Sequence, residues 1–352
     1  MKLINSFFKF LIRKGINTLN IFIFILNNRR IIPFTTEVSN NIKIKSTRLV
    51  IGKHVRIGKN VHINCGELYL GSGIVISDNV KIENVGKVYI GNYTIIAENV
   101  FINGLKGTVF KIGNLSWIGR SSFLNASRNI TIGNGTCIGI GSKVFTHGCW
   151  FEVAEGYKLN YKDVYIGNNV WLALNVIVQP GAQINDNVFV NSGSIVNGVL
   201  ESGYIYAGIP SVKQCPINKI KKDVTISEKM QVIAYYISSR LIDSGWKGTW
   251  IKKIEYNRPY TFKKLSRIVN IMFISQDITN IPSTRGKFIY FFPQVSPSMR
   301  AAVEKSNSLL LIDLIHKVSY GSEYLEHLLL TLLRDFIFRF YPNKWKDEIY
   351  KQ

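Results

Sequence analysis

The segment that decides the fold is IGNNVWLALNVIVQPGAQI, residues 166–184. A branched aliphatic residue stands at every sixth position: Ile166, Leu172, Val178 and Ile184. A six-residue unit that combines one buried aliphatic residue with a turn residue suits a short strand followed by a tight corner. Three such units would close one triangular coil of about 18 residues, with the aliphatic column filling the inside of the prism.

The same period extends over residues 51–200, where every position of the series is Ile, Leu or Val. The further members are Ile51, Ile57, Ile63, Leu70, Ile76, Ile82, Ile90, Ile96, Ile102, Ile112, Ile118, Leu124, Ile132, Ile138, Val144, Val190 and Val196. Residues at the corners include Asn60, Asn79, Asn99, Asn134 and Asn168, and asparagine tolerates the left-handed backbone that tight corners need. Parallel crossovers are normally right-handed, so the spacing by itself leaves the hand of the coil open.

The period breaks in two places. Between Val144 and Ile166 we expect residues 145–164 to leave the coil as an extruded loop that carries His147, because loops on rigid scaffolds often hold the chemistry. The second break, at residues 198–210, ends the repeat. We therefore expect a basic amphipathic N-terminal segment at 1–44, a β-helix domain at 45–213 and a C-terminal α/β domain at 214–352.

Three strings in this order resemble the hexapeptide-repeat acyltransferases, in particular the branch of maltose and galactoside acetyltransferases and polysaccharide O-acetyltransferases. They are residues 164–184, VNSGSIV at 190–196 and AGIPS at 207–211. The resemblance covers residues 45–213. It implies a mainly β chain built on a left-handed parallel β-helix, a homotrimer with active sites in grooves between subunits, and acetyl-CoA or a related acyl-CoA as the donor.

The resemblance also implies a loop histidine as general base, and the matching residue is His147. A sugar hydroxyl is a poor nucleophile until its proton is removed, and imidazole, with an ordinary pKa of about 6.5, can accept that proton at neutral pH. Attack on the thioester carbonyl produces an oxyanion that a backbone N–H or small polar group must stabilise. Asn125 matches an asparagine that contacts substrate or orients the histidine in similar enzymes, although a simple turn residue is the alternative.

Other residues match the positions where the family binds its cofactor. Trp171 resembles the tryptophan beside the pantetheine arm, with packing against a neighbouring subunit as the alternative. Ala173 stands where the family usually has glycine, and it keeps that position small. Ser192 and Gly193 match the place where backbone groups approach pantetheine. Lys213 could meet the nucleotide phosphates, or could simply be a solvated lysine in a basic chain.

Metal and covalent chemistry find little support in the sequence. Cys149 lies two residues from His147, but direct acyl transfer needs no thiol nucleophile and too few further ligands are nearby for a metal. A zinc-dependent carbonic anhydrase on this scaffold would need three histidines at matching coil positions, and only His147 is suitably placed. Glu152, Glu155 and Asp163 in the same loop are candidate partners for His147, and sequence position does not separate them.

The charge of the chain points to anionic partners. Its 44 Lys and Arg outnumber 22 Asp and Glu, for a formal charge of +22, but no base-reading motif accompanies the charge, so we expect no nucleic-acid partner. The first 36 residues are basic and apolar, and Lys9, Arg13 and Lys14 interrupt the roughly 20 apolar residues that a spanning helix needs. We expect a cytoplasmic protein whose leader lies on an anionic membrane surface. A helix that packs on the second domain and a signal peptide are the alternatives.

After residue 213 the six-residue period disappears. Residues 227–244 and 323–340 have helical spacing of apolar residues, whereas 249–256, 267–275, 287–292 and 308–316 resemble strands. We recognise no catalytic string in this part. It could bind an anionic acceptor such as a glycan or a lipid-linked precursor, or it could extend the trimer.

The predicted function is acetyl-CoA-dependent O-acetylation of a sugar hydroxyl in a bacterial surface polysaccharide, of capsule or O-antigen type, or in its precursor. His147 would be the base and no metal would take part. An N-acetyltransferase of an amino sugar or sugar nucleotide uses the same scaffold and cofactor, and an alkali-labile product distinguishes an ester from an amide. A non-catalytic β-helix for glycan binding or assembly is the alternative from another class, and it would bind no acyl-CoA.

Overall fold

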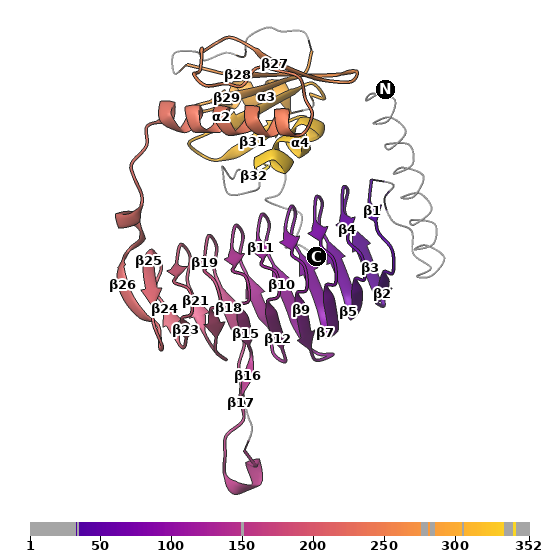
Figure 1. Ribbon diagram of the computed structural model, residues 1–352, viewed down its shortest axis with the longest axis vertical. Helices are drawn as coiled ribbons and strands as arrows, with labels where there is room; N and C mark the ends of the chain where they lie inside the picture. The colour runs from indigo at the N-terminus through magenta and orange to yellow at the C-terminus, as the bar shows by residue number, and fades with distance from the viewer. Residues whose placement is uncertain are drawn as a thin grey trace. The chain divides into compact units, whose positions relative to one another are not determined.

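The computed structural model describes residues 33, 35–148, 151–275, 281, 286–304, 306–333 and 341–342. The chain divides into two compact units, Met1–Lys221 and Lys222–Gln352 (Figure 1). Most of the expected N-terminal amphipathic segment, including Lys9, Arg13 and Lys14, lies outside the described residues. Within the part of the chain that the structure describes, no helix is both long and apolar enough to cross a membrane.

The first unit is a left-handed parallel β-helix, as the family resemblance implies. One of its faces is a ten-stranded sheet, parallel throughout except for its last pair. In spatial order its strands are β1 (Glu37–Val38), β4 (Arg56–Ile57), β6 (Val75–Ile76), β8 (Ile95–Ile96), β11 (Trp117–Ile118), β14 (Cys137–Ile138), β19 (Trp171–Leu172), β22 (Phe189–Val190), β25 (Tyr204–Ala207) and β26 (Val212–Pro216).

The other two faces belong to one continuous sheet, because β5 (His62–Leu70) and β7 (Lys81–Ile90) each pass from one face to the next. The second face also holds β2 (Lys43–Lys45), β9 (Phe101–Gly104), β12 (Phe123–Ala126), β15 (Lys143–Phe145), β20 (Ile177–Val178) and β23 (Ile195–Val196). The third face also holds β3 (Arg48–Ile51), β10 (Val109–Ile112), β13 (Ile130–Ile132), β18 (Val164–Ile166), β21 (Gln183–Ile184) and β24 (Val199–Leu200).

The predicted aliphatic column forms the core of the prism. Every position in the six-residue series is buried except Ile51, which is partly buried and packs against that core. The residue two positions before each member of the series after Ile51 is also buried, because side chains two residues apart on a strand point to the same side of the sheet. At several of these positions the residue is Ser or Thr, and its hydroxyl donates to a carbonyl of the next coil, as Ser142 does to Ala173 O at 3.2 Å.

Asparagine has two roles at the corners of the coils, and only the left-handed backbone was predicted from the sequence. Asn60, Asn79 and Asn99 have the left-handed backbone expected of them, with φ of 55°, 60° and 59°. The expectation was wrong for Asn134 and Asn168, which are absent from the left-handed residues. Their side-chain oxygens instead accept backbone N–H groups of the preceding coil, from Asn114 and Asn134 at 2.7 and 2.8 Å. At these corners asparagine therefore joins successive coils by side-chain hydrogen bonds and does not adopt the left-handed backbone.

Between β15 and β18 the chain leaves the coil and forms a hairpin, which projects from the β-helix in Figure 1. Strand β16 (His147–Gly148) pairs antiparallel with β17 (Asn160–Tyr161), and the 3-10 helix η1 (Val153–Glu155) lies between them in sequence. His147 is therefore at the base of the hairpin, opposite Tyr161. This position holds the imidazole next to the rigid coil rather than at a free loop tip.

The second unit contains a six-stranded sheet with helices. In spatial order the strands are β27 (Tyr260–Lys264), β28 (Arg267–Phe273), β29 (Phe288–Phe292), β30 (Leu309–Asp313), β31 (Val318–Gly321) and β32 (Tyr341–Pro342). The described helices are α2 (Ile226–Asp243), α3 (Pro297–Val303) and α4 (Glu323–Leu333), and the 3-10 helix η2 (Ile217–Ile220) precedes them in the first unit. Residues 334–340 of the last predicted helix lie outside the described part.

The strand predicted at 249–256 was wrong. These residues pair with no strand except through an isolated bridge next to them, at Lys247. Ile251 and Ile254 are buried, and their backbone N–H groups donate to the side chains of Ser238 and Gln231 on α2, both at 2.9 Å. This segment is a loop that is apolar enough to resemble a strand. Its buried backbone N–H groups bond to side chains of α2 instead of to a neighbouring strand. Strands β27 and β31 and helix α3 were not predicted, because elements this short carry little periodicity.

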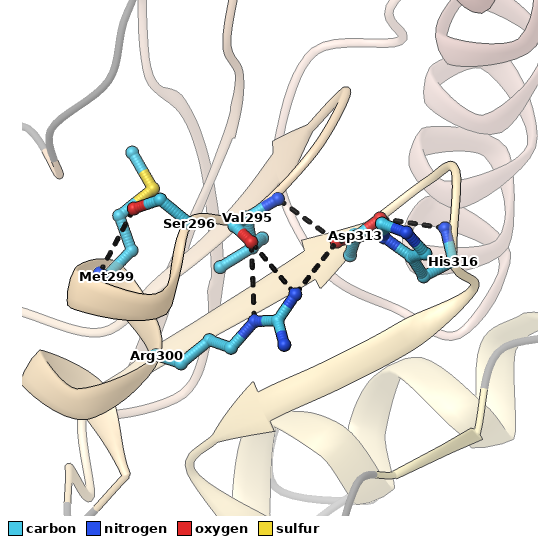
Figure 2. A network of polar contacts seen from close by, with 6 residues as sticks. All are labelled: Val295, Ser296, Met299, Arg300, Asp313 and His316. Carbon is cyan, nitrogen blue, oxygen red and sulfur yellow. Dashed lines mark hydrogen bonds and ion pairs between the residues drawn. The ribbon is translucent and has the colours of Figure 1, made fainter.

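A buried carboxylate joins two strand ends of this sheet (Figure 2). Asp313, at the end of β30, is fully buried and accepts the backbone N–H of Val295 at 3.0 Å and that of His316 at 2.8 Å. The Nδ1 atom of His316 lies 2.9 Å from its Oδ2, and a guanidinium nitrogen of Arg300 lies 4.0 Å from the same oxygen. The two backbone N–H donors, the imidazole of His316 and the guanidinium of Arg300 together offset the cost of burying the carboxylate.

Replacing this carboxylate should destabilise the second unit. Asp313→Ala would leave the buried N–H of Val295 and the imidazole of His316 without their acceptor and would remove the carboxylate beside Arg300, so we expect the free energy of unfolding to fall by about 3 kcal/mol. Urea denaturation followed by the fluorescence of the buried Trp246 measures the change. Glu304→Gln, at an exposed carboxylate without a partner among the described residues, is the matched control. Equal unfolding midpoints for the two variants would show that the network contributes little.

Candidate active site

The predicted base and the predicted asparagine are in direct contact. His147 Nδ1 lies 2.7 Å from Asn125 Oδ1. Asn125 is on β12, which pairs in parallel with β15, and its register partner is Phe145, two residues before His147. Asn125 is 7 % exposed, whereas the imidazole is half-buried. The stacking of successive coils therefore holds the amide rigidly beneath the imidazole.

The surroundings of Asn125 determine the tautomer of His147. Its Oδ1 atom also faces the backbone N–H of Ser127, which donates to it at 3.3 Å, so the atom near His147 is the amide oxygen rather than the amide nitrogen. An amide oxygen can only accept, and Nδ1 must therefore carry the hydrogen. Neutral imidazole has one N–H, so Nε2 keeps the lone pair that a general base needs. Within the described part of the chain, Nε2 has no hydrogen-bond partner.

Three further residues, which were not predicted from the sequence, support the contact between His147 and Asn125. The ring of Tyr161 stacks on the imidazole, with centroids 5.4 Å apart and planes at 20°. The guanidinium of Arg128 lies over the ring of Tyr161, 5.7 Å from its centroid. Thr146 is fully buried, donates to Asn125 O at 2.7 Å and accepts from the backbone N–H of Arg128 at 2.9 Å. The hairpin register that brings Tyr161 to His147 has no signal in the sequence.

The loop carboxylates do not contact His147. Asp163 accepts from the backbone N–H and the side-chain amide of Asn129, at 3.0 and 3.1 Å. Glu152, which precedes η1, and Glu155, its last residue, are both exposed. An amide, rather than a carboxylate, therefore orients the imidazole. The Cys–His pairing weighed from the sequence lies outside the described residues, because Cys149 is one of those left out.

Trp171 and Ala173 lie on the first face of the prism. Trp171 is 53 % exposed, and its ring is 4.6 Å from that of Phe189 on the next coil. Ala173 is buried, with its N–H bonded to Val190 O at 2.9 Å. The carbonyl of Ala173 is so close to Gly139 that a Cβ there would meet it at 1.9 Å, which explains glycine at that corner.

Ser192 and Gly193 form an exposed corner on the following coil. Ser192 Oγ accepts the backbone N–H of Leu174 at 3.2 Å, and Gly193 N donates to Leu174 O at 2.8 Å. Gly193 has a left-handed φ of 71°, and no atom lies within 4 Å of where its Cβ would be. The corner is therefore open on its outer side, and a ligand could approach the backbone closely.

Lys213 is already paired. Its ammonium donates to Glu201 at 2.5 Å and lies over the ring of Tyr204, 4.2 Å from the centroid. The hydrogen bond to the Glu201 carboxylate raises the pKa of Lys213. A phosphate at this position would have to compete with Glu201, so Lys213 is the weakest of the predicted cofactor residues.

The predicted site residues form two separate groups within one chain. His147 and Asn125 contact each other beside the second face, whereas Trp171 belongs to the first face and Ser192 and Gly193 follow it. No hydrogen bond or ring contact among the described residues joins the two groups.

Comparison with known proteins confirms the resemblance to the hexapeptide-repeat acetyltransferases. The chain is 30 % identical over 111 residues to galactoside O-acetyltransferase of Escherichia coli, a match that covers 29 % of this chain and 54 % of that protein. It is 31 % identical over 101 residues to a putative colanic acid biosynthesis acetyltransferase of the same organism, covering 29 % of this chain and 55 % of that protein. The chain thus spans about half the length of the curated relatives it matches. No family model matches it.

Solved structures show low overall similarity. The polysialic-acid-specific acetyltransferase NeuO is 20 % identical, with a TM-score of 0.34, and the match covers 55 % of this chain and 91 % of that one. The hexapeptide-repeat acetyltransferase VCA0836 of Vibrio cholerae, solved with acetyl-CoA, is 19 % identical, with a TM-score of 0.28 and coverage of 49 % and 70 %.

Proposed function

We propose that this protein is an acetyl-CoA-dependent O-acetyltransferase that acts on a sugar hydroxyl of a bacterial surface polysaccharide or its precursor. The observation that carries the proposal is the 2.7 Å contact between Asn125 Oδ1 and His147 Nδ1, which leaves Nε2 with the lone pair that a general base needs. The curated relatives support the reaction class, since they are named as sugar and polysaccharide acetyltransferases.

In this mechanism Nε2 of His147 removes the proton of the sugar hydroxyl as its oxygen attacks the thioester carbonyl. The tetrahedral intermediate collapses with loss of the CoA thiolate, which recovers the proton from the imidazolium. Asn125 accepts the Nδ1–H throughout, so its oxygen stabilises the charge that develops on the ring. The transfer is direct and needs neither a covalent enzyme intermediate nor a metal.

We further propose that the active enzyme is a homotrimer. Because His147 and Trp171 are on different faces of one prism, a groove between two subunits would bring the base of one chain to the cofactor residues of its neighbour. In that groove Trp171 would line the pantetheine arm, and the open corner at Ser192 and Gly193 would approach the arm through its backbone.

Removing the exposed indole should weaken donor binding. Trp171→Ala is expected to raise the Kd for acetyl-CoA at least about fivefold, because an aromatic contact with the bound donor contributes roughly 1 kcal/mol beyond the area that it buries. Titration calorimetry measures this, with Trp250→Ala in the second unit as the matched exposed-tryptophan control. If the parent binds no acetyl-CoA, the proposed function fails. If Trp171→Ala binds acetyl-CoA as tightly as the parent, Trp171 is not part of the donor site.

A further inference from the structure

Two columns of outward side chains run along the second face of the β-helix and end at the candidate active site. Strands β9, β12 and β15 lie side by side there (Figure 1). In register, Phe101 is beside Phe123, which is beside Lys143, and Asn103 is beside Asn125, which is beside Phe145. Because side chains two residues apart on a strand point to the same side, β9 and β12 each place a ring and an amide close together, and β15 places Phe145 beside Asn125.

The aromatic side chains form a continuous strip. The rings of Phe101 and Phe123 have centroids 5.5 Å apart with planes at 32°, and those of Phe123 and Phe145 are 5.8 Å apart at 71°. All three are half-buried, so each keeps part of its ring accessible. Phe145 is two residues from His147, and the strip therefore reaches the catalytic imidazole.

The amide column runs parallel to this strip. Asn103 lies one coil before Asn125, and its Oδ1 accepts from Asn84 Nδ2 at 3.4 Å. Among the described residues, the amide nitrogens of Asn103 and Asn125 donate to nothing. Asn103 is half-buried, so its amide is a donor that a sugar hydroxyl can accept from, one coil away from the asparagine that contacts the base.

Exposed lysines stand at both ends of the aromatic strip. Lys81 pairs in register with Phe101, and Lys143 pairs with Phe123. Both are exposed, and neither has an ion-pair partner in the part of the chain that the structure describes. Their charge would favour an acidic ligand along the strip.

We propose that Phe101, Phe123 and Asn103 form an acceptor tract, which binds further sugar residues of an acidic glycan chain whose reacting unit lies at His147. Aromatic rings beside amides suit a carbohydrate, since rings contact its C–H faces and amides bond its hydroxyls. Successive coils are about 4.8 Å apart, so the two coil steps from Phe145 to Phe101 extend for about 10 Å, enough for linked sugar rings. The proposal rests on the proposed function and specifies its acceptor as an oligosaccharide or polymer.

The test is binding of the fluorescently labelled full chain to an array of bacterial surface glycans, from single sugars to octasaccharides, both neutral and acidic. We expect acidic glycans of three or more residues to bind most strongly. Phe101→Leu keeps an apolar side chain but loses the flat ring, and Asn103→Ala removes the amide. Each should weaken binding of the longer glycans about tenfold and leave binding of single sugars unchanged.

Tyr89→Leu is the matched control, because Tyr89 stacks on Tyr69 at 4.6 Å on a different face of the same coils. His147→Ala should retain glycan binding while losing acetyl transfer, which separates the two proposals. The tract is overturned if no glycan binds, if single sugars bind as well as chains, or if the Phe101 and Asn103 variants match Tyr89→Leu. If acetyl transfer by the parent persists in such a case, the proposed function stands without the tract.

Discussion

Replacing His147 by alanine is expected to reduce the rate of acetyl transfer by at least 10²-fold, and up to about 10⁴-fold, because general base catalysis contributes that much to such reactions. The loss should fall on kcat, since the imidazole acts on the proton in transit rather than on ground-state binding. Release of CoA thiol in the presence of a glycan acceptor measures it, with donor binding determined separately by calorimetry.

His62→Ala is the matched control for this variant. His62 is on the second face of an early coil, where its Nδ1 lies 3.8 Å from a carboxylate oxygen of Glu83 at the surface, so its loss should cost little stability or activity. A His147→Ala enzyme with a kcat within about threefold of the parent would show that the histidine is structural and that the mechanism is wrong.

The second large effect is expected at Asn125. Asn125→Ala removes the oxygen that accepts Nδ1–H, so the imidazole of His147 can rotate and can place its hydrogen on Nε2, where it blocks proton abstraction. Loss of such an orienting partner typically costs 10–100-fold, and we expect a fall of about that size in kcat. The KM for acetyl-CoA should change little, because Asn125 lies with the base rather than with the predicted donor residues.

Asn125→Asp provides the discriminating control. A carboxylate keeps an acceptor oxygen at the position of Oδ1, so this variant should retain more activity than Asn125→Ala. A purely structural role predicts the reverse order, because the buried position, 7 % exposed, tolerates a small apolar side chain better than an added charge. Steady-state kinetics of the two variants, compared after thermal melts confirm folding, therefore distinguish positioning from packing.

Much of the fold could be predicted from the sequence because each coil repeats the same physical requirement. A buried aliphatic residue at every sixth position is a pattern that few other architectures produce, and the burial of Ile57, Leu124 and Val178 confirms it. The roles of Asn134 and Asn168 were harder to predict, because asparagine can either adopt a left-handed corner or accept a backbone N–H of the preceding coil. The neighbouring coil decides between these, and a single sequence does not show it.

The sequence proposes residues for the candidate site but does not give their geometry. The family strings pointed to His147 and Asn125, which are 22 residues apart and meet only because of the parallel register of β12 and β15. The stacking of Tyr161 depends on the pairing of β16 with β17, for which the loop sequence has no distinctive signal. In the second unit His316 had no visible partner in sequence, yet its contact with Asp313 closes a turn of four residues.

The most direct test of the account is incubation of the full-length protein with acetyl-labelled acetyl-CoA and a panel of bacterial surface glycans, followed by mass analysis of the glycans before and after mild alkali. If the protein is an O-acetyltransferase with His147 as its base, a glycan gains labelled acetyl groups that alkali removes, as an ester requires, and His147→Ala abolishes this gain. Labelled acetyl groups that resist alkali would identify an amide and contradict O-acetylation. No transfer to any glycan, together with no binding of acetyl-CoA, would contradict an acetyltransferase of any kind.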